Sequence, residues 1–350
     1  MLRQLGLIHP IFQAPMAGVS TPALAAAVSN AGGLGAIGIG ATDVAGARQM
    51  IAETRVATAR PFNVNVFAHA TPHRDPQRER AWLDALAPLF AEFGAEPPAS
   101  LRRIYESFND APALMDLLIE TRPAVVSFHF GLPGRAAIEA LHAAGITLLA
   151  TATNLHEAQL IAQSGIDGIV AQGIEAGGHR GIFDPDAEDP QLGTLALTRL
   201  LVRETNLPVI AAGGIMDGAG IAAALRLGAV AAQLGTAFLD CPESAADAAY
   251  RRALHGPGAQ ATRLTSVISG RPARALASRF TQLEQTAPDL CPPAYPIAYD
   301  AGKALHAAAK AQGEYGFGAY WAGQGAPLAR AMPASRLMAT LAQELQETRV

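Results

Sequence analysis

Short, almost uninterrupted apolar runs alternate along the chain with longer stretches in which apolar residues recur at helical spacing. Such runs are typical of parallel strands buried on both faces, and the stretches between them predict helices that connect successive strands. The runs expected to form strands are residues 10–16, 33–39, 62–67, 124–130, 147–153, 168–173, 208–214 and 229–238. Eight β/α units favour an α/β fold with a closed (β/α)₈ TIM barrel, although an open doubly wound sheet also fits alternating elements.

Three helix starts can be placed from capping residues. Thr21 precedes Pro22 and an alanine-rich stretch, which predicts a helix that begins at Pro22. Asn154 and Glu157 have the spacing of a capping box for the helix after the fifth strand. Asp217 lies where it would cap the helix after the seventh strand.

Two regions exceed what a barrel needs. Residues 68–122 are long, polar and proline-containing, and the chain from 241 onward adds a further helical segment. We therefore predict a barrel core over residues 1–240 with a helical insertion at about 68–122, which forms a smaller substrate domain. The C-terminal helical region, 241–350, is expected to cover the active site and complete the outside of the barrel.

Composition and charge exclude several classes of protein. The net charge is −4 and no long basic block occurs, so a nucleic-acid partner is not expected. The only cysteines are Cys241 and Cys291, and the nine histidines are scattered without a carboxylate cluster, so neither a disulfide framework nor a metal site is expected. The N-terminal residues lack a secretion signal, and Asp217 and Arg226 interrupt the most apolar stretch, 208–239. We predict a cytoplasmic protein with no membrane partner.

Polar side chains gather toward the carboxyl ends of the predicted strands. They are Gln13, Asn65, His129, Thr153, Gln172 and Gln233. In the run FNVNVF, Asn63 and Asn65 alternate with valines and so fall on one face. Any single residue of this set could be a hydrogen-bonded core residue, since buried polar groups are normally paired. Together they predict one polar pocket, because barrel enzymes build their sites where strands end.

Glycines follow the seventh and eighth strands, as Gly213-Gly214 and Gly235-Thr236. Glycines let backbone N–H groups close around an anion, and barrels often bind phosphate at these two loops. A phosphorylated cofactor is expected there, with plain tight turns as the alternative. The chain has no G-x-x-x-x-G-K-[ST] motif, which excludes a P-loop nucleoside triphosphatase.

The densest motif, QGIEAGGHRG, spans Gln172–Gly181 directly after the sixth strand. Gly177 and Gly178 permit close approach of a planar ligand, and His179 on the same loop can act as a base or present a hydrogen-bonding group. The alternative is a loop histidine that only caps a carbonyl, and Arg180 is expected to be a surface or salt-bridged residue. Neither G-x-S-x-G nor a cysteine beside this loop occurs, which excludes serine-hydrolase and thiol chemistry.

Several segments, in order, resemble the nitronate monooxygenases, formerly called 2-nitropropane dioxygenases. They are PIFQAPMAGVSTPALAAAVSNAGGLGAIG, FNVNVF, VVSFHFG, AQGIEAGGHRG, LPVIAAGGIMDG and AAQLGTAF, which run from Pro10 to Phe238, with YPIAYDAGK in the C-terminal region. The strand-seven glycines occur in many FMN barrels. The combination of EAGGHRG, SFHFG and YPIAYDAGK is far more specific and resembles the first class of these enzymes.

The resemblance implies a (β/α)₈ barrel with a smaller helical domain that holds FMN non-covalently. The residues implied to contact FMN are Ala14, Pro15, Met16, Asn65, Gln172, Gly177, Gly213, Gly214, Gln233, Leu234, Gly235 and Thr236. His179 is the implied catalytic residue. The residues implied to bind substrate are His129, Tyr105, Tyr250, Tyr295, Tyr299 and Lys303. For Tyr299 and Lys303, which are at helical spacing, an exposed helix face is the alternative.

The implied reaction is oxidation of an alkyl nitronate, propionate 3-nitronate above all, by O₂ to a carbonyl compound and nitrite or nitrate. The nitronate gives one electron to FMN, through a flavosemiquinone. A monomer or homodimer with these small-molecule partners is expected.

Three alternatives stay open. An FMN-dependent enoyl-acyl-carrier-protein reductase shares the EAGGH loop, and an NADH:quinone reductase shares the scaffold; a flavin-binding interaction protein would not be an enzyme. A dehydrogenase of the inosine-monophosphate type needs a cysteine that the strand-six loop lacks.

The stretch GGLGAIG, residues 32–38, contains G-x-G-x-x-G, the spacing of a dinucleotide-binding turn. Such a turn must follow a strand and open a helix, whereas this stretch follows the helix that begins at Pro22 and itself forms the second strand. We therefore expect the match to be coincidental, with the glycines making room for a flavin.

Overall fold

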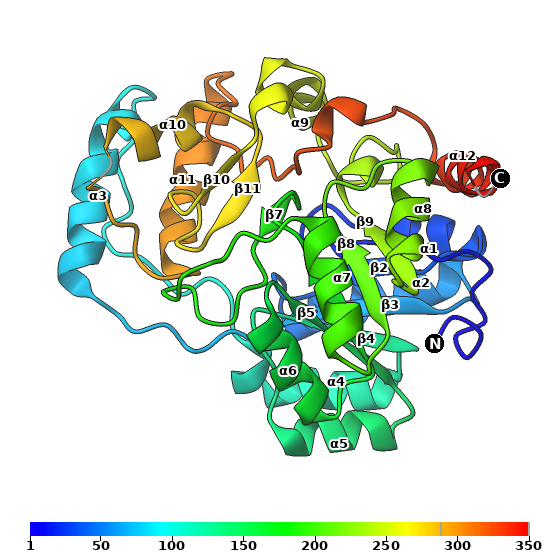
Figure 1. The fold of residues 1–350 in the computed structure, drawn as a ribbon. Helices are drawn as coiled ribbons and strands as arrows, with labels where there is room; N and C mark the ends of the chain where they lie inside the picture. Colours follow the sequence, from blue (N-terminus) through cyan, green and yellow to red (C-terminus); the bar gives the residue numbers. More distant parts are fainter. Residues whose placement is uncertain (288, 349–350) are drawn as a thin grey trace.

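Eight parallel strands form a barrel whose helices lie on its outer surface (Figure 1). The computed structural model describes residues 1–287 and 289–348. The barrel strands are β1 (Ile11–Gln13), β2 (Gly35–Gly38), β3 (Phe62–Phe67), β4 (Val125–His129), β5 (Thr147–Ala152), β6 (Gly168–Gln172), β8 (Val209–Ala212) and β9 (Ala231–Leu234). Their order is β1-β9-β8-β6-β5-β4-β3-β2, and a bridge between Phe12 and Leu34 joins the two ends. The predicted TIM barrel is confirmed, and the open doubly wound sheet is wrong.

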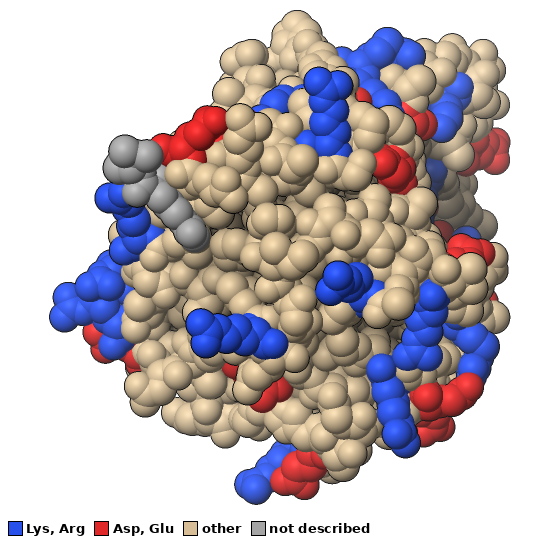
Figure 2. Space-filling view, turned by 90° about the vertical axis from the view of Figure 1, so that its right-hand side faces the viewer, with Lys and Arg blue, Asp and Glu red and all other residues tan. Residues whose placement is uncertain are grey.

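The helices on the outside of the barrel follow the strands in turn. They are α1 (Pro22–Asn30), α2 (Val44–Ala57), α4 (Pro112–Thr121), α5 (Arg135–Ala143), α6 (Leu155–Ser164), α7 (Thr194–Glu204) and α8 (Gly218–Arg226). The C-terminal helix α12 (Ala334–Glu347) packs against α8 and α1. Figure 2 shows the face that carries this end of the chain, where acidic and basic side chains are dispersed around a largely uncharged centre. Among the described residues, no helix is both long and apolar enough to cross a membrane.

Local sequence explains where several helices begin. The side chains of Thr21, Asn154 and Asp217 each accept a backbone N–H from the residue three positions later, so all three predicted caps are present. The second hydrogen bond of the predicted capping box, from the Asn154 N–H to the Glu157 side chain, does not form, so this part of the prediction is wrong. The Glu157 carboxylate accepts instead from the backbone N–H and the hydroxyl of Thr153, at 2.6 and 2.8 Å. It thereby ties the end of β5 to α6.

The barrel has an apolar interior on its amino-terminal side. Phe12, Leu34, Val125, Leu149 and Ile210 fill this interior and are at most 1% exposed. The alternate strand positions face outward and pack against the helices, as the period of two residues requires. Polar side chains lie mostly toward the carboxyl ends of the strands, although Asn63 near the start of β3 and Ser127 in the middle of β4 are also buried.

A second layer lies over the carboxyl ends of the barrel strands (Figure 1). It contains α3 (Pro76–Ala91), α9 (Ala248–Leu254), α10 (Arg279–Thr286), α11 (Ile297–Ala311) and an antiparallel sheet of β10 (Arg263–Thr265), β11 (Ala273–Ala275) and β7 (Gly178–His179). The short 3₁₀ helices are η1 (Phe108–Asp110), η2 (Thr236–Phe238), η3 (Pro257–Ala261) and η4 (Ala326–Leu328). Helix α3 packs on α11, around a core that includes Trp82, Phe90, Phe280 and Leu305. The insertion after β3 and the C-terminal region thus share one core, while the predicted domain limits stay a prediction.

The loop after β6 departs from the sequence-based picture, because Gly178 and His179 form strand β7. This strand pairs with β11, where His179 lies opposite Ala273. The eighth predicted strand, 229–238, is also too long. Strand β9 ends at Leu234, and η2 begins at Thr236, since the chain turns at the rim of the barrel.

The glycines of GGLGAIG serve packing within the protein. The predicted helix–strand order is confirmed, so the stretch is not a dinucleotide turn. A Cβ on Gly35 would lie 1.9 Å from the Ala25 carbonyl oxygen, and one on Gly38 would lie 3.1 Å from the Ala17 nitrogen. The expectation that these glycines make room for a flavin is wrong, since protein atoms occupy the space.

Candidate active site

A large cavity opens at the carboxyl ends of the barrel strands, beneath the second layer. Its atom-free space, counted together with the open mouth, is about 1360 Å³. The predicted site residues that line it are Ala14, Pro15, Met16, Asn65, Tyr105, His129, Gln172, Gly177, His179, Gly213, Gly214, Gln233, Gly235, Thr236, Tyr250, Tyr295 and Tyr299. Its described lining includes no Lys, Arg, Asp or Glu.

Two predicted residues lie outside this lining. The side chain of Leu234, the last residue of β9, is buried in the hydrophobic core. Its backbone carbonyl accepts the N–H of Ala14, a residue of the cavity lining, at 2.8 Å. Lys303 is exposed on α11, and its ammonium nitrogen lies 5.0 Å from the ring centre of Tyr105 and 5.4 Å from that of Tyr299. Tyr299 itself lines the cavity, so the alternative of an exposed helix face is wrong for Tyr299.

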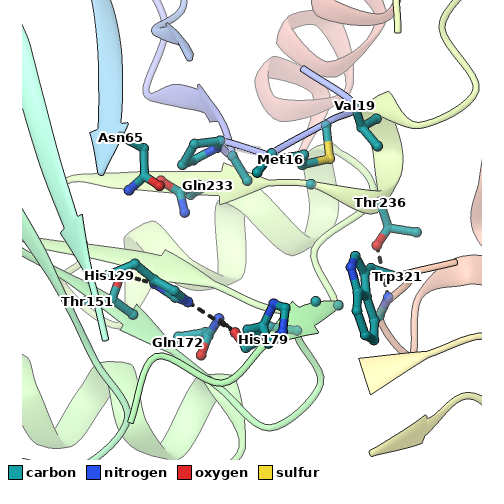
Figure 3. Close-up of a pocket in the computed structure, with 18 of the residues that line it drawn as sticks. Met16, Val19, Asn65, His129, Thr151, Gln172, His179, Gln233, Thr236 and Trp321 are labelled. Atoms are coloured by element: carbon teal, nitrogen blue, oxygen red, sulfur yellow. Dashed lines mark hydrogen bonds between the residues drawn. The ribbon is translucent and has the colours of Figure 1, made fainter. Parts of the chain in front are cut away.

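The polar residues at the strand ends divide into two groups. Those that line the cavity are Asn65, His129, Gln172 and Gln233 (Figure 3). Gln13 is buried and saturated, because its amide donates to the Ser20 hydroxyl at 2.8 Å and accepts from the Ala36 N–H at 2.8 Å. Thr153 is bound to Glu157. The prediction that all six face one pocket is wrong for Gln13 and Thr153, which hold the barrel together.

The loops after β8 and β9 form a cradle of free N–H groups. We use the term N–H cradle for the backbone of Gly213, Gly214, Gly235 and Thr236. None of these N–H groups donates to a described residue. Gly213 and Gly214 have φ of 123° and 68°, a region that favours glycine, and a Cβ on Gly213 would lie 2.6 Å from the Thr194 hydroxyl. Helix α8 begins shortly after, so its positive dipole end adds to the attraction for an anion.

His129 and His179 are joined through the His179 backbone. The Nε2–H of His129 donates to the His179 carbonyl at 3.1 Å, which leaves Nδ1 as the acceptor for the Thr151 hydroxyl at 3.0 Å. The Gln172 amide donates to the same carbonyl at 3.0 Å. The His179 ring contacts Ser269, with 2.8 Å between Nε2 and Oγ.

Both histidines are held neutral. Burial is the main cause that lowers the pKa of His179 to about 3, and the neighbouring His129 and the Arg271 guanidinium add to it. Burial likewise lowers the pKa of His129 to about 4. Near neutral pH both rings are therefore uncharged imidazoles.

Aromatic side chains surround His179. The ring centres of Tyr295, Trp321 and Phe130 lie 5.2, 5.0 and 5.6 Å from that of His179. Tyr105 packs against Tyr295 at 6.4 Å, and burial raises the pKa of Tyr105 to about 12. These phenols stay protonated near neutral pH.

Tyr250 plays a more structural part in this wall. Its hydroxyl donates to the Trp321 carbonyl, and its ring stacks on that of Tyr320 at 4.7 Å between centres. Burial raises the Tyr250 pKa well above its usual range. Tyr250 therefore anchors the segment that carries Trp321 into the cavity.

Sequence reasoning missed Phe130, Trp321, Ser269 and Arg271. Phe130 follows His129 in the SFHFG segment and has φ of 75°, rare for an aromatic residue, so the run of aromatic residues at a strand end was an available signal. Arg271 is 3% exposed, and its guanidinium carbon lies 4.4 Å above the Phe130 ring. Nothing local in the sequence indicates that Trp321 lines this cavity, or that Ser269 and Arg271 contact the rings of His179 and Phe130 behind its lining.

Arg180, on the same loop as His179, is fully buried and forms an ion pair with Asp189 at 2.8 Å. It also donates to the Gln172 carbonyl at 2.9 Å. The expectation of a salt-bridged residue is confirmed, and that of a surface residue is wrong. Arg180 fixes the loop and lies outside the cavity lining.

Comparisons with known proteins agree with this geometry. A family model described as nitronate monooxygenase matches residues 1–344. The chain is 60% identical to a nitronate monooxygenase of Paraburkholderia phytofirmans over 99% of this chain and 95% of the relative. It is 58% identical to one of Pseudomonas aeruginosa over 98% of each chain. The crystal structure of a nitroalkane oxidase from Streptomyces ansochromogenes superposes with a TM-score of 0.92 at 41% identity, covering 100% of this chain and 99% of that one. The chain therefore belongs to the nitronate monooxygenase family and is an enzyme of the oxidoreductase class.

Proposed function

We propose that the protein binds FMN and oxidises alkyl nitronates with O₂, giving a carbonyl compound and nitrite or nitrate. Propionate 3-nitronate is the proposed substrate. The family consists of flavin-dependent oxidoreductases, and the free N–H groups of the cradle support FMN, a flavin that carries a phosphate. The observation that carries the proposal is that the N–H cradle and the neutral His179 share one cavity.

The cradle fits the phosphate of FMN. Its unpaired N–H groups would otherwise be unsatisfied at a cavity wall, and a phosphate would accept from several of them. Gly213 and Gly214 supply the positive φ that this turn of the backbone requires. The amides of Asn65, Gln172 and Gln233 supply hydrogen-bonding groups for the rest of the cofactor. Bound FMN would supply the redox chemistry, accepting electrons from the nitronate and passing them to O₂.

His179 would hold or move a proton at Nδ1. A nitronate is an anion, and an anion beside a neutral imidazole raises its pKa, which favours proton uptake. The protonated ring then donates to a nitronate oxygen. With a neutral nitroalkane the unprotonated Nδ1 would act as the base instead.

Charges around the cavity favour an anionic substrate. Arg271 lies behind Phe130, and Lys303 lies over Tyr105 and Tyr299 at the outer side of the aromatic wall. No carboxylate lines the described cavity to oppose them. Positive charge without a facing negative charge draws anions toward a site and raises the rate of encounter.

The test is turnover by the FMN-loaded protein. We expect O₂ consumption and nitrite release with propionate 3-nitronate, and neither with NADH alone. NADH oxidation that depends on a crotonyl thioester or on a quinone would instead support one of the two reductases. If FMN binds but no nitronate, NADH or quinone reacts, a flavin-binding interaction protein is the better description.

A further inference from the structure

Ser269 connects the His179 ring to the second layer. The residue lies in the loop between β10 and β11, ninety positions from His179 in the chain, and is 0% exposed. Its Oγ lies 2.8 Å from His179 Nε2 and 3.2 Å from the carbonyl oxygen of Arg271. A hydroxyl has one proton to donate, so these two contacts constrain each other.

Only one arrangement of protons satisfies all three groups. The Arg271 carbonyl has no other donor among the described residues. If Ser269 donates to this carbonyl, its lone pair is free to accept the Nε2–H of His179, and every group is paired. If Ser269 donated to Nε2 instead, a buried carbonyl would be left without a partner, which is unfavourable. The first arrangement is therefore favoured.

The backbone of His179 is already fixed by other groups. Its carbonyl accepts from His129 and Gln172, and β7 pairs it with Ala273 of β11. These backbone contacts fix neither the rotation of the His179 ring nor which of its two nitrogens carries the proton. Ser269 is the only described residue that hydrogen-bonds to the ring itself. Nδ1 makes no hydrogen bond and is not among the buried atoms that lack a partner, so it faces the accessible space of the cavity.

We propose that Ser269 is a positioning residue that accepts the Nε2–H of His179 and so keeps Nδ1 unprotonated and directed into the cavity. Its effect on turnover rests on the proposed function, whereas the tautomer is a property of the protein alone. Without this acceptor, nothing among the described residues would hold the ring in the Nε2–H tautomer, and the ring could turn. Nδ1 would then often carry a proton before substrate arrives, and it could neither take one up nor remove one.

The direct test is nitrogen NMR of the FMN-loaded protein with ¹⁵N-labelled histidine, the His179 signals being identified by their loss in His179→Gln. In the unaltered protein at neutral pH we expect a protonated Nε2 and an unprotonated Nδ1. A protonated Nδ1 there would overturn the proposal, whatever the variants do. In Ser269→Ala we expect averaged or exchanged nitrogen signals, restored in Ser269→Thr, which keeps a hydroxyl.

The matched control is Ser266→Ala in the same loop, since the Ser266 side chain makes no hydrogen bond to a described residue. It should keep the original tautomer. Loss of a residue that orients another side chain typically lowers activity about ten- to a hundredfold. We therefore expect kcat with propionate 3-nitronate to fall by that much in Ser269→Ala, but not in Ser269→Thr or Ser266→Ala. An unchanged tautomer in Ser269→Ala overturns the positioning role. An unaltered protein that shows the expected tautomer but oxidises no nitronate refutes the proposed function and leaves the tautomer assignment standing.

Discussion

The chemistry of the site depends on individual side chains whose state is set by burial. His179 is the clearest case, because its ring is neutral, its Nε2 is occupied by Ser269, and its Nδ1 faces a cavity lined by no charged side chain among the described residues. An imidazole with one nitrogen already hydrogen-bonded and the other free can exchange a proton with a ligand at the free nitrogen alone.

Replacing His179 should therefore remove turnover without removing the cofactor. In His179→Asn we expect FMN to bind as before, since the N–H cradle is untouched, and kcat with propionate 3-nitronate to fall by about 10²–10⁴-fold, the range of a lost proton-transfer group. Flavin absorbance and O₂ consumption measure the two effects. His73→Asn, at an exposed histidine, is the control. Near-normal nitronate oxidation by His179→Asn would refute the role given to His179.

The buried histidines also make stability depend on pH. Their folded pKa values of about 3 and 4 lie below the ordinary value of 6.5, so between about pH 6.5 and pH 4 the unfolded chain binds protons that the folded chain does not. Stability is then lost as pH falls through this window. In His129→Gln, whose amide can still donate to the His179 carbonyl, we expect a shallower decline of Tm from pH 7 to pH 4. Parallel curves for the two proteins would contradict the assignment of a depressed pKa to His129.

At the scale of elements, two loops and one helix end make up the proposed phosphate site. Gly214→Asp tests it, because the substitution adds a negative charge beside the N–H cradle, which would repel a phosphate. We expect FMN affinity to fall on the order of a hundredfold, as like charges at one site cost several kcal/mol. Gly214→Asn has the same shape, tolerates the same positive φ and has no charge, and should keep most of the affinity. Equal FMN binding by the two variants would mean that the phosphate lies elsewhere.

Helix packing gives a second prediction at this scale. A Cβ on Gly218, the first residue of α8, would lie 2.3 Å from the Glu344 Cβ and 2.4 Å from its backbone, whereas one on Gly220 would be no closer than 3.2 Å to any neighbour. We expect Gly218→Ala to lower the free energy of unfolding by about 1–3 kcal/mol through forced displacement of α12. Gly220→Ala should be neutral or stabilising, because alanine favours a helix. Denaturant unfolding of the two variants distinguishes these outcomes, and equal stabilities would show that α12 does not pack as described.

At the scale of the whole molecule, the features that could be predicted from the sequence are those that depend on residues close together in the chain. The barrel strands and the helix starts at Thr21 and Asp217 depend on neighbours in sequence, and their prediction is confirmed. The cavity could also be located, because strand ends converge on one rim of a barrel. Gln13 was assigned to the wrong environment, since its hydrogen bonds reach Ala36 on another strand.

The parts that could not be predicted depend on distant segments. Strand β7 forms by pairing with β11, which lies more than ninety residues later in the chain. Trp321 reaches the cavity because Tyr250 holds its carbonyl, and Ser269 reaches His179 through the second layer. No local periodicity encodes such contacts. The residue roles carried over from the resemblance stay predictions until variants are measured.

The central claim is that the bound flavin takes electrons from a nitronate. Anaerobic mixing of the FMN-loaded protein with propionate 3-nitronate and, separately, with NADH tests it most directly. We predict a rapid change in the absorbance of oxidised FMN with the nitronate and none with NADH. Reduction by NADH with no response to the nitronate would contradict the account.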